Sequence, residues 1–184
     1  MSESKTISVE IAPNCNFECP GCVNGARLFD KRDKRSESNL ADLICEYVPQ
    51  DSSLVFAGLG ETLNGTGQRR IEQILNTRED INACAQTNGT FQLNDGLVDL
   101  IENRRLGVGI STDSHHIKGN EYGFGPKIQK ELISAASVAV SPEDDEFVIQ
   151  GILNNLEEYP HLNRVLYDPF IENVQTHNPT ISTS

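Results

Sequence analysis

Residues 53–61 read Ser-Leu-Val-Phe-Ala-Gly-Leu-Gly-Glu, a short apolar run that stops at two glycines and a carboxylate. An apolar run of this length bounded by Gly predicts a buried β-strand over residues 53–57. Apolar side chains at helical spacing lie on either side, over residues 39–47 and 67–77. The segment therefore predicts a helix, a strand and a helix, with a Gly-rich polar turn where the strand ends.

The same alternation of strand and helix continues through the chain. Strands that alternate with helices pair in parallel through crossover helices. Each such unit takes ~30 residues, so the chain holds about six, short of the ~250 residues of a closed eight-stranded barrel. The prediction is an α/β fold of about six βα units with parallel strands, as an open, partial TIM-type barrel or a doubly wound open sheet. Further strands are predicted over residues 6–12, 81–86, 106–111, 136–140 and 164–167, and further helices over residues 94–103, 127–134 and 146–159.

Apolar spacing also predicts which helix residues face the core. Asn94 is a plausible N-cap of the helix over residues 94–103. Candidate core positions in the two outer helices are Leu40, Leu43, Ile44 and Tyr47 in the first, and Phe147, Ile149, Leu153 and Leu156 in the last.

Composition narrows the classes of function. The chain has 184 residues, with 15 Lys and Arg against 27 Asp and Glu, a formal charge of −12, and 37% hydrophobic residues. The hydrophobic fraction supports a packed core, while the charge argues against broad nucleic-acid binding, which needs clustered Lys and Arg. No apolar run approaches the ~20 residues that span a bilayer. Residues 1–6 (MSESKT) lack a secretory signal's basic and apolar regions. We expect a cytoplasmic protein without a membrane partner.

Three of the five cysteines, Cys15, Cys19 and Cys22, fall within eight residues of each other. An odd cysteine count argues against a disulfide framework. Three thiolates in one loop can converge on one metal centre. That centre is either zinc, which needs a fourth ligand, or a cubane iron–sulfur cluster with one iron left open. Cys45, in a helix stripe, and Cys84, in a strand interior, are interpreted as core thiols rather than ligands.

The segment 15–22 (CNFECPGC), directly after the first predicted strand, resembles the cluster-binding loop of the radical S-adenosylmethionine (SAM) superfamily. The resemblance implies that Cys15, Cys19 and Cys22 hold a [4Fe–4S] cluster and that SAM chelates its open iron. In that family one electron cleaves the sulfonium–C5′ bond, and the 5′-deoxyadenosyl radical takes a hydrogen from the substrate. The resemblance also implies an oxygen-sensitive enzyme with a partial barrel and helices outside.

Three further segments, each at a predicted strand end, resemble the same family. Residues 56–63 (FAGLGETL) are similar to its Gly-Gly-Glu-Pro-Leu element, which implies that Gly58, Gly60 and Glu61 meet the methionyl ammonium of SAM. That ammonium loses water on binding and needs an acceptor, and glycines let the backbone come close. Residues 86–90 (QTNGT) and 110–114 (ISTDS) also resemble family segments, and in the latter Ser111 and Asp113 would meet the ribose.

The chain departs from the family in places. Gly21 stands where an aromatic residue usually packs near adenine, so adenine needs another partner, such as the backbone near Tyr167. Thr62 replaces the usual Pro. The predicted organisation is a core-like domain over residues 1–170, with a cluster loop over residues 13–38, and a polar tail over 171–184. The tail has no second cysteine cluster, so the family's C-terminal domain with auxiliary clusters is not expected.

Two polar segments have competing interpretations. Residues 27–35 (RLFDKRDKR) hold five basic side chains. They form either a solvated loop balanced by acidic neighbours or a docking patch for an acidic electron donor, such as flavodoxin or ferredoxin, or for an anionic substrate. His115 and His116 belong either to a polar loop or to a metal or proton-transfer site.

Three classes of function are compatible with the sequence. The segment 110–116 favours a small-molecule or peptide substrate. The Cys-Pro-Gly-Cys sequence and the short chain resemble activating enzymes that make a glycyl radical on a partner protein. A third class is a non-catalytic zinc or iron–sulfur module. Gly60 and Glu61 argue against that class, because a structural site has no use for an ammonium acceptor.

Overall fold

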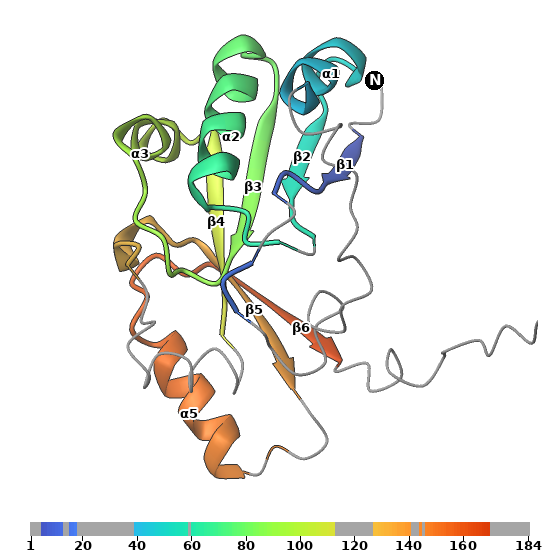
Figure 1. Cartoon of the computed structure of the whole chain (residues 1–184). Helices are drawn as coiled ribbons and strands as arrows, with labels where there is room; N and C mark the ends of the chain where they lie inside the picture. The colour runs from blue at the N-terminus through green and yellow to red at the C-terminus, as the bar shows by residue number, and fades with distance from the viewer. Residues whose placement is uncertain are drawn as a thin grey trace, which may run out of the picture.

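The computed structural model describes residues 5–12, 15–17, 39–58, 60–112, 127–140, 144 and 146–169. Its strands form one parallel sheet in sequence order, and within these residues the first and last strands are not paired (Figure 1). The sheet is therefore open, and the predicted α/β partial barrel is confirmed. The strands are β1 (Thr6–Val9), β2 (Ser53–Phe56), β3 (Asn82–Thr87), β4 (Leu106–Ser111), β5 (Ala135–Val140) and β6 (Arg164–Pro169).

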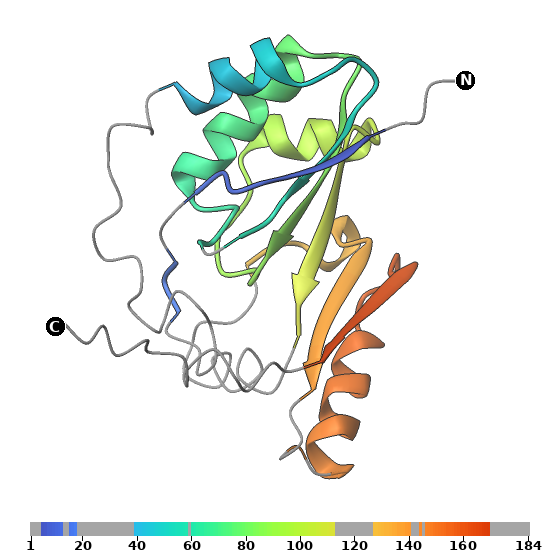
Figure 2. The ribbon, with the colours of Figure 1, turned by 90° about the vertical axis from the view of Figure 1, so that its right-hand side faces the viewer.

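The helices α1, α2 and α3 cover one face of β1 to β4, and α5 lies beside β5 and β6 (Figures 1 and 2). Right-handed crossovers that always advance in one direction keep their helices on one face. A doubly wound sheet would instead need a reversal of strand order, which this sheet lacks. Among the described residues the helices are α1 (Leu40–Tyr47), α2 (Gly65–Thr77), α3 (Asp95–Glu102) and α5 (Glu146–Leu156), together with the 3₁₀ turn η3 (Lys130–Leu132).

The helices α2 and α3 each begin after an asparagine that caps the first turn. The side chain of Asn94 accepts a hydrogen bond from the backbone N–H of Leu97, which confirms the predicted N-cap of α3. Asn64 does the same for α2, accepting from the backbone of Thr66 and Gly67. In the part of the chain that the structure describes, no helix is long and apolar enough to cross a membrane.

The core lies between the sheet and the helices α1, α2, α3 and α5. On β2, Leu54 and Phe56 are buried and alternate with half-buried residues. On β4, Leu106, Val108 and Ile110 are buried, and of the two glycines between them Gly107 is half-buried and Gly109 buried. From the helices, α2 contributes Ile71, Ile74 and Leu75, all fully buried. The alternate residues of the strands therefore point to the opposite, more open face of the sheet, as the pleat requires.

One predicted helix is wrong. Residues 127–134 form only the turn η3, flanked by extended backbone at Gln129 and Ile133. Ile128 and Ile133 are both buried, and a spacing of five would put them on different sides of a helix. The backbone N–H of Lys127 also donates to the carbonyl of Gly89, which holds the segment against the loop after β3.

The predicted core faces of the outer helices are partly wrong. On α5 the buried residues are Ile152 and Leu156, while Phe147 is 86% exposed. Two apolar stripes compete on this helix, and only the stripe of Ile152 and Leu156 packs on the core, with Val148 partly buried against it. The remaining predicted core residues that are exposed are Ile149 and Leu153 on α5, and Leu43 and Tyr47 on α1.

Candidate functional site

The predicted site residues that the structure describes come from the carboxyl ends of the first four strands. Cys15 follows β1, Gly58 to Glu61 follow β2, the turn of residues 87–90 closes β3, and Ser111 is the last residue of β4. In a parallel sheet these ends lie on one edge, where α/β proteins bind ligands. Outside the described residues lie Cys19, Cys22, Asp113, Gly21, His115, His116, the basic run 27–35 and the tail 171–184.

Glu61 joins the ends of β2 and β3. Its side chain is 3% exposed. Oε1 accepts hydrogen bonds from the backbone N–H of Leu63 at 2.9 Å and from the hydroxyl of Thr87 at 2.5 Å. Oε2 accepts from the backbone N–H of Asn88 at 2.8 Å. Donors of this kind stabilise a buried carboxylate. The carboxylate that the sequence assigned to the SAM ammonium thus also fixes the relative position of two loops.

The backbone conformation and the close packing at position 58 require a glycine. Its φ is +147°, a conformation that L side chains rarely adopt, and a Cβ there would lie 2.9 Å from Cγ of Glu10. The turn after β2 consequently passes very close to the chain that leaves β1. Gly58 therefore permits a close approach within the protein itself, in addition to the role that the resemblance implies.

Three polar side chains form a closed ring between the β1 and β3 loops, which we call the amide ring: Asn16, Asn88 and Thr90. Nδ2 of Asn88 donates to Oδ1 of Asn16 at 2.9 Å, and Nδ2 of Asn16 donates to the Thr90 hydroxyl at 2.9 Å. The Thr90 hydroxyl donates to Oδ1 of Asn88 at 2.7 Å, which closes the ring. Each bond polarises the next in such a cycle. The ring ties the start of the cluster loop to the end of β3.

Cys15 has N–H donors directed at its sulfur. The backbone N–H of Phe17 donates to Sγ at 3.4 Å, and Nδ2 of Asn88 lies 3.8 Å from it. Sulfur is a weak acceptor as a thiol, and N–H donors favour its thiolate form, which is the form that binds metal. This donor set fits a thiolate ligand of an iron–sulfur cluster. Among the described residues no group of three metal-ligating side chains occurs, since of the predicted ligands they include only Cys15.

The two remaining cysteines lie elsewhere. Cys45 is half-buried on α1 and packs at the margin of the core. Cys84 is half-buried in the middle of β3, on the same strand face as Gln86. Burial raises the pKa of the Cys84 thiol, against a smaller opposing effect of the Arg164 charge. Both thiols are half-buried and not fully buried, and their interpretation as non-ligating cysteines stays a prediction.

Ser111 is oriented by a residue of the neighbouring strand. Its hydroxyl accepts a hydrogen bond from Nε2 of Gln86 at 3.0 Å. The Gln86 side chain lies directly over Gly109, where a Cβ would come within 2.6 Å of Oε1. Sequence reasoning missed Gln86 and Asn16 as individual site residues. The period of two along β3 was the available signal for Gln86, because it places that side chain on the open face of the sheet beside Ser111.

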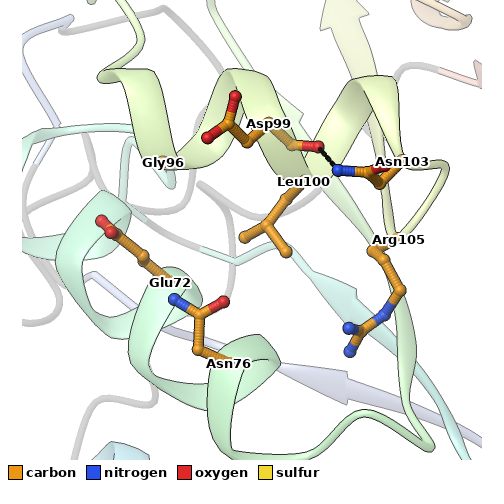
Figure 3. A pocket seen from close by; sticks show the side chains of 7 residues that line it. All are labelled: Glu72, Asn76, Gly96, Asp99, Leu100, Asn103 and Arg105. Carbon is orange, nitrogen blue, oxygen red and sulfur yellow. Dashed lines mark hydrogen bonds between the residues drawn. The ribbon is translucent and has the colours of Figure 1, made fainter.

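A separate polar groove of about 480 Å³ lies between α2 and α3 (Figure 3). Its lining includes Glu72 and Asn76 on α2 and Asp99 on α3. Arg105 also lines it, but donates through Nη2 to the carbonyls of Leu75, Arg78 and Ile81. This groove belongs to the helical layer and not to the carboxyl edge of the sheet, so it is not the candidate site.

Comparison with known proteins supports the fold. No protein-family model matches the chain, and no curated protein matches it. The solved structure of native anSMEcpe with bound AdoMet (SAM) aligns with a TM-score of 0.56 at 14% identity, over 91% of this chain and 51% of that one. The hexahistidine-tagged form of the same protein gives 0.56 at 13% identity, with the same coverage. BtrN in complex with AdoMet and 2-DOIA gives 0.38 at 18%, over 91% and 57%. The chain thus shares the fold of anSMEcpe and spans about half of its length.

Proposed function

We propose that this protein is a radical SAM enzyme. One observation carries the proposal: Cys15, Glu61 and the 87–90 turn, from three different strand ends, meet in one hydrogen-bonded network at the carboxyl edge of an open parallel barrel. The fold is that of a protein that binds AdoMet. When bound, a [4Fe–4S] cluster and SAM supply one-electron cleavage of SAM to methionine and a 5′-deoxyadenosyl radical that abstracts a hydrogen from substrate.

The residues of this chain have distinct roles in the proposal. Cys15, Cys19 and Cys22 hold three irons, which leaves a fourth open for SAM. The turn from Gly58 to Glu61 accepts the methionyl ammonium, and its glycines bring main-chain carbonyls close to the ligand. Glu61 fixes that turn against Asn88 through its buried carboxylate.

Ser111 and Asp113 hold the ribose, and Gln86 sets the orientation of the Ser111 hydroxyl. A small molecule or a peptide is the proposed substrate. Flavodoxin or ferredoxin is the proposed electron donor, and residues 27–35 are its proposed docking patch.

The test begins with anaerobic reconstitution of the full chain. We expect a brown protein with about four iron and four sulfide per chain, heat of SAM binding by calorimetry, and 5′-deoxyadenosine after addition of dithionite. Cys15→Ala removes the cluster, while Cys45→Ala, the matched control, keeps it. A colourless protein with one zinc would instead establish the non-catalytic module. An intact cluster with no SAM binding would also overturn the proposal.

A further inference from the structure

Asn88 contacts the ends of three strands through different atoms. Its backbone N–H donates to Glu61, after β2. Its Oδ1 accepts from the backbone N–H of Thr90 at 3.0 Å, at the end of β3. Its Nδ2 faces Asn16 and Cys15, after β1, at 2.9 and 3.8 Å. The residue is 7% exposed, so these partners replace the water that its amide would otherwise bind.

The direction of the Asn88 amide follows from its partners. The backbone N–H of Thr90 can only donate, so the oxygen of the amide must face it. The two N–H groups then face Oδ1 of Asn16 and Sγ of Cys15, one for each. The donor at the Cys15 sulfur is consequently fixed by the turn after β3 and by the amide ring, and does not depend on the cluster loop alone.

We propose that Asn88 is a positioning residue of the iron–sulfur site. It docks Cys15 and Asn16 onto the end of β3, and through its amide N–H it raises the reduction potential of the cluster that Cys15 ligates. This inference rests on the proposed function. Reduction adds negative charge that is shared with the ligating sulfurs, and N–H donors to those sulfurs stabilise that charge. Removal of the donor therefore disfavours the reduced state.

Two substitutions separate the donor from the fold. Asn88→Asp keeps the backbone N–H and an oxygen for Thr90, but replaces both side-chain donors with an acceptor. Asn88→Ala removes the donors without adding charge. Asn94→Asp is the matched control, since it makes the same chemical change at the N-cap of α3, where the side-chain oxygen already accepts from Leu97.

The main readout is the midpoint potential of the reconstituted cluster, titrated with dithionite and followed spectroscopically. We expect both Asn88 variants to lower the equilibrium constant for one-electron reduction about threefold to tenfold, a shift of ~30–60 mV at ~59 mV per tenfold. Asn94→Asp leaves the potential within error of the wild type. Unchanged potentials in both Asn88 variants overturn the inference. A shift in Asn88→Asp alone also overturns the inference, because the added charge then explains the effect. A shift in Asn88→Ala alone overturns it as well, because loss of the turn then explains the change in potential.

A second readout needs no cluster. In the metal-free protein, urea unfolding of Asn16→Ala, Asn88→Ala and the double variant forms a mutant cycle. Docking through the amide ring predicts that the two losses are coupled by about threefold or more in the folding equilibrium constant, and purely additive losses overturn the docking. A wild type that takes up no cluster refutes the proposed function and the effect on potential together. A wild type with a cluster and SAM binding, but unshifted variants, refutes the role of Asn88 alone.

Discussion

At the scale of single residues, Glu61 connects packing with ligand chemistry. Its carboxylate is buried and receives the N–H groups of Leu63 and Asn88 and the hydroxyl of Thr87. If the side chain is removed, those donors are left without their acceptor inside the protein. Glu61, which the sequence motif marks only as a ligand-binding residue, is therefore also a residue that stabilises the fold.

We expect Glu61→Ala to lower the free energy of unfolding by about 3 kcal/mol, since each buried polar group left unpaired costs about 1–3 kcal/mol. SAM binding falls with it, because the turn after β2 loses its anchor. Urea denaturation and calorimetry measure the two effects. Glu131→Ala, an exposed site on η3, should change stability by no more than about 0.5 kcal/mol. A Glu61→Ala protein of wild-type stability would show that the carboxylate is not integrated into the fold.

A second residue-scale prediction concerns Gly109. The Cβ of Gly109→Ala would lie 2.6 Å from Oε1 of Gln86, so that side chain must move away from Ser111. The atom it meets is the far end of a flexible side chain, so the movement itself costs little, and loss of the Gln86–Ser111 hydrogen bond should lower the free energy of unfolding by about 0.5–1.5 kcal/mol. Gly151→Ala on α5 is the control, since its Cβ meets nothing within 4 Å and Ala is favoured over Gly in helices by about 0.5–1 kcal/mol. Gln86→Ala removes the same hydrogen bond, so the double variant should be no less stable than Gln86→Ala alone, and an additive loss would place the effect of Gly109→Ala elsewhere.

At the scale of elements, Arg78 clamps α1 to the end of α2. Its Nη1 donates to the carbonyls of Cys45 and Val48, which end α1. Nε and Nη2 donate to the two carboxylate oxygens of Asp80, at 2.8 and 2.7 Å. This hydrogen bond holds the pKa of Asp80 well below its usual value and raises the pKa of Arg78. A two-pronged contact of this kind also fixes the orientation of the guanidinium.

The lowered pKa of Asp80 predicts a pH dependence. Because the folded-state pKa lies below the unfolded one, the stabilising contribution is present above the unfolded pKa, ~4. It is lost as the pH falls from there through the folded-state pKa. The difference in unfolding free energy between wild type and Asp80→Asn should therefore be full at pH 7 and shrink below about pH 4. Asp99→Asn, an exposed site on α3, provides the control series. A difference that does not change between pH 7 and pH 3 would contradict the clamp.

Elements were predictable from sequence to different degrees. Strands such as β4 follow from a short apolar run bounded by polar turns, and the observed bounds match the predicted residues 106–111. The segment around Ile128 and Ile133 was not predictable, because both side chains are buried on either side of the short turn η3, in a segment held by a hydrogen bond to the carbonyl of Gly89. On α5, Phe147 is as apolar as Ile152, and only the position of the sheet selects the buried stripe.

The candidate site also has residues that the sequence predicts and residues that it does not. Cys15 and Glu61 stand in sequence motifs that can be recognised without the structure. Asn16 and Asn88, which are 72 residues apart, become partners only when the sheet brings their loops together. No local pattern specifies such a pair, since the parallel pairing of β1 with β2 and of β2 with β3 creates the contact.

At the scale of the whole molecule, the basic run 27–35 contrasts with a net charge of −12. If it docks an acidic reductase, the charge reversals Lys31→Glu and Lys34→Glu should slow turnover driven by flavodoxin and flatten its salt dependence. Turnover with dithionite should stay within error. Lys5→Glu with Arg104→Asp, just before the amino ends of β1 and β4, is the control for net charge. An equal loss with both reductants would point to substrate binding or folding instead.

The order of the strands has a consequence for local unfolding. Pairing Thr6 with Ser53 closes 47 residues (53 − 6), whereas pairing Ser53 with Asn82 closes 29 (82 − 53) and pairing Ala83 with Leu106 closes 23 (106 − 83). Closure entropy rises with loop length, and β1 is a four-residue edge strand that buries none of its residues fully. The amides of β1 should therefore exchange with deuterium faster than those of β3 and β4. Cys15 connects β1 to the end of β3 through its contact with Asn88. A metal bound at Cys15 would therefore slow the exchange of the β1 amides, and cofactor loading could be measured as their protection from exchange.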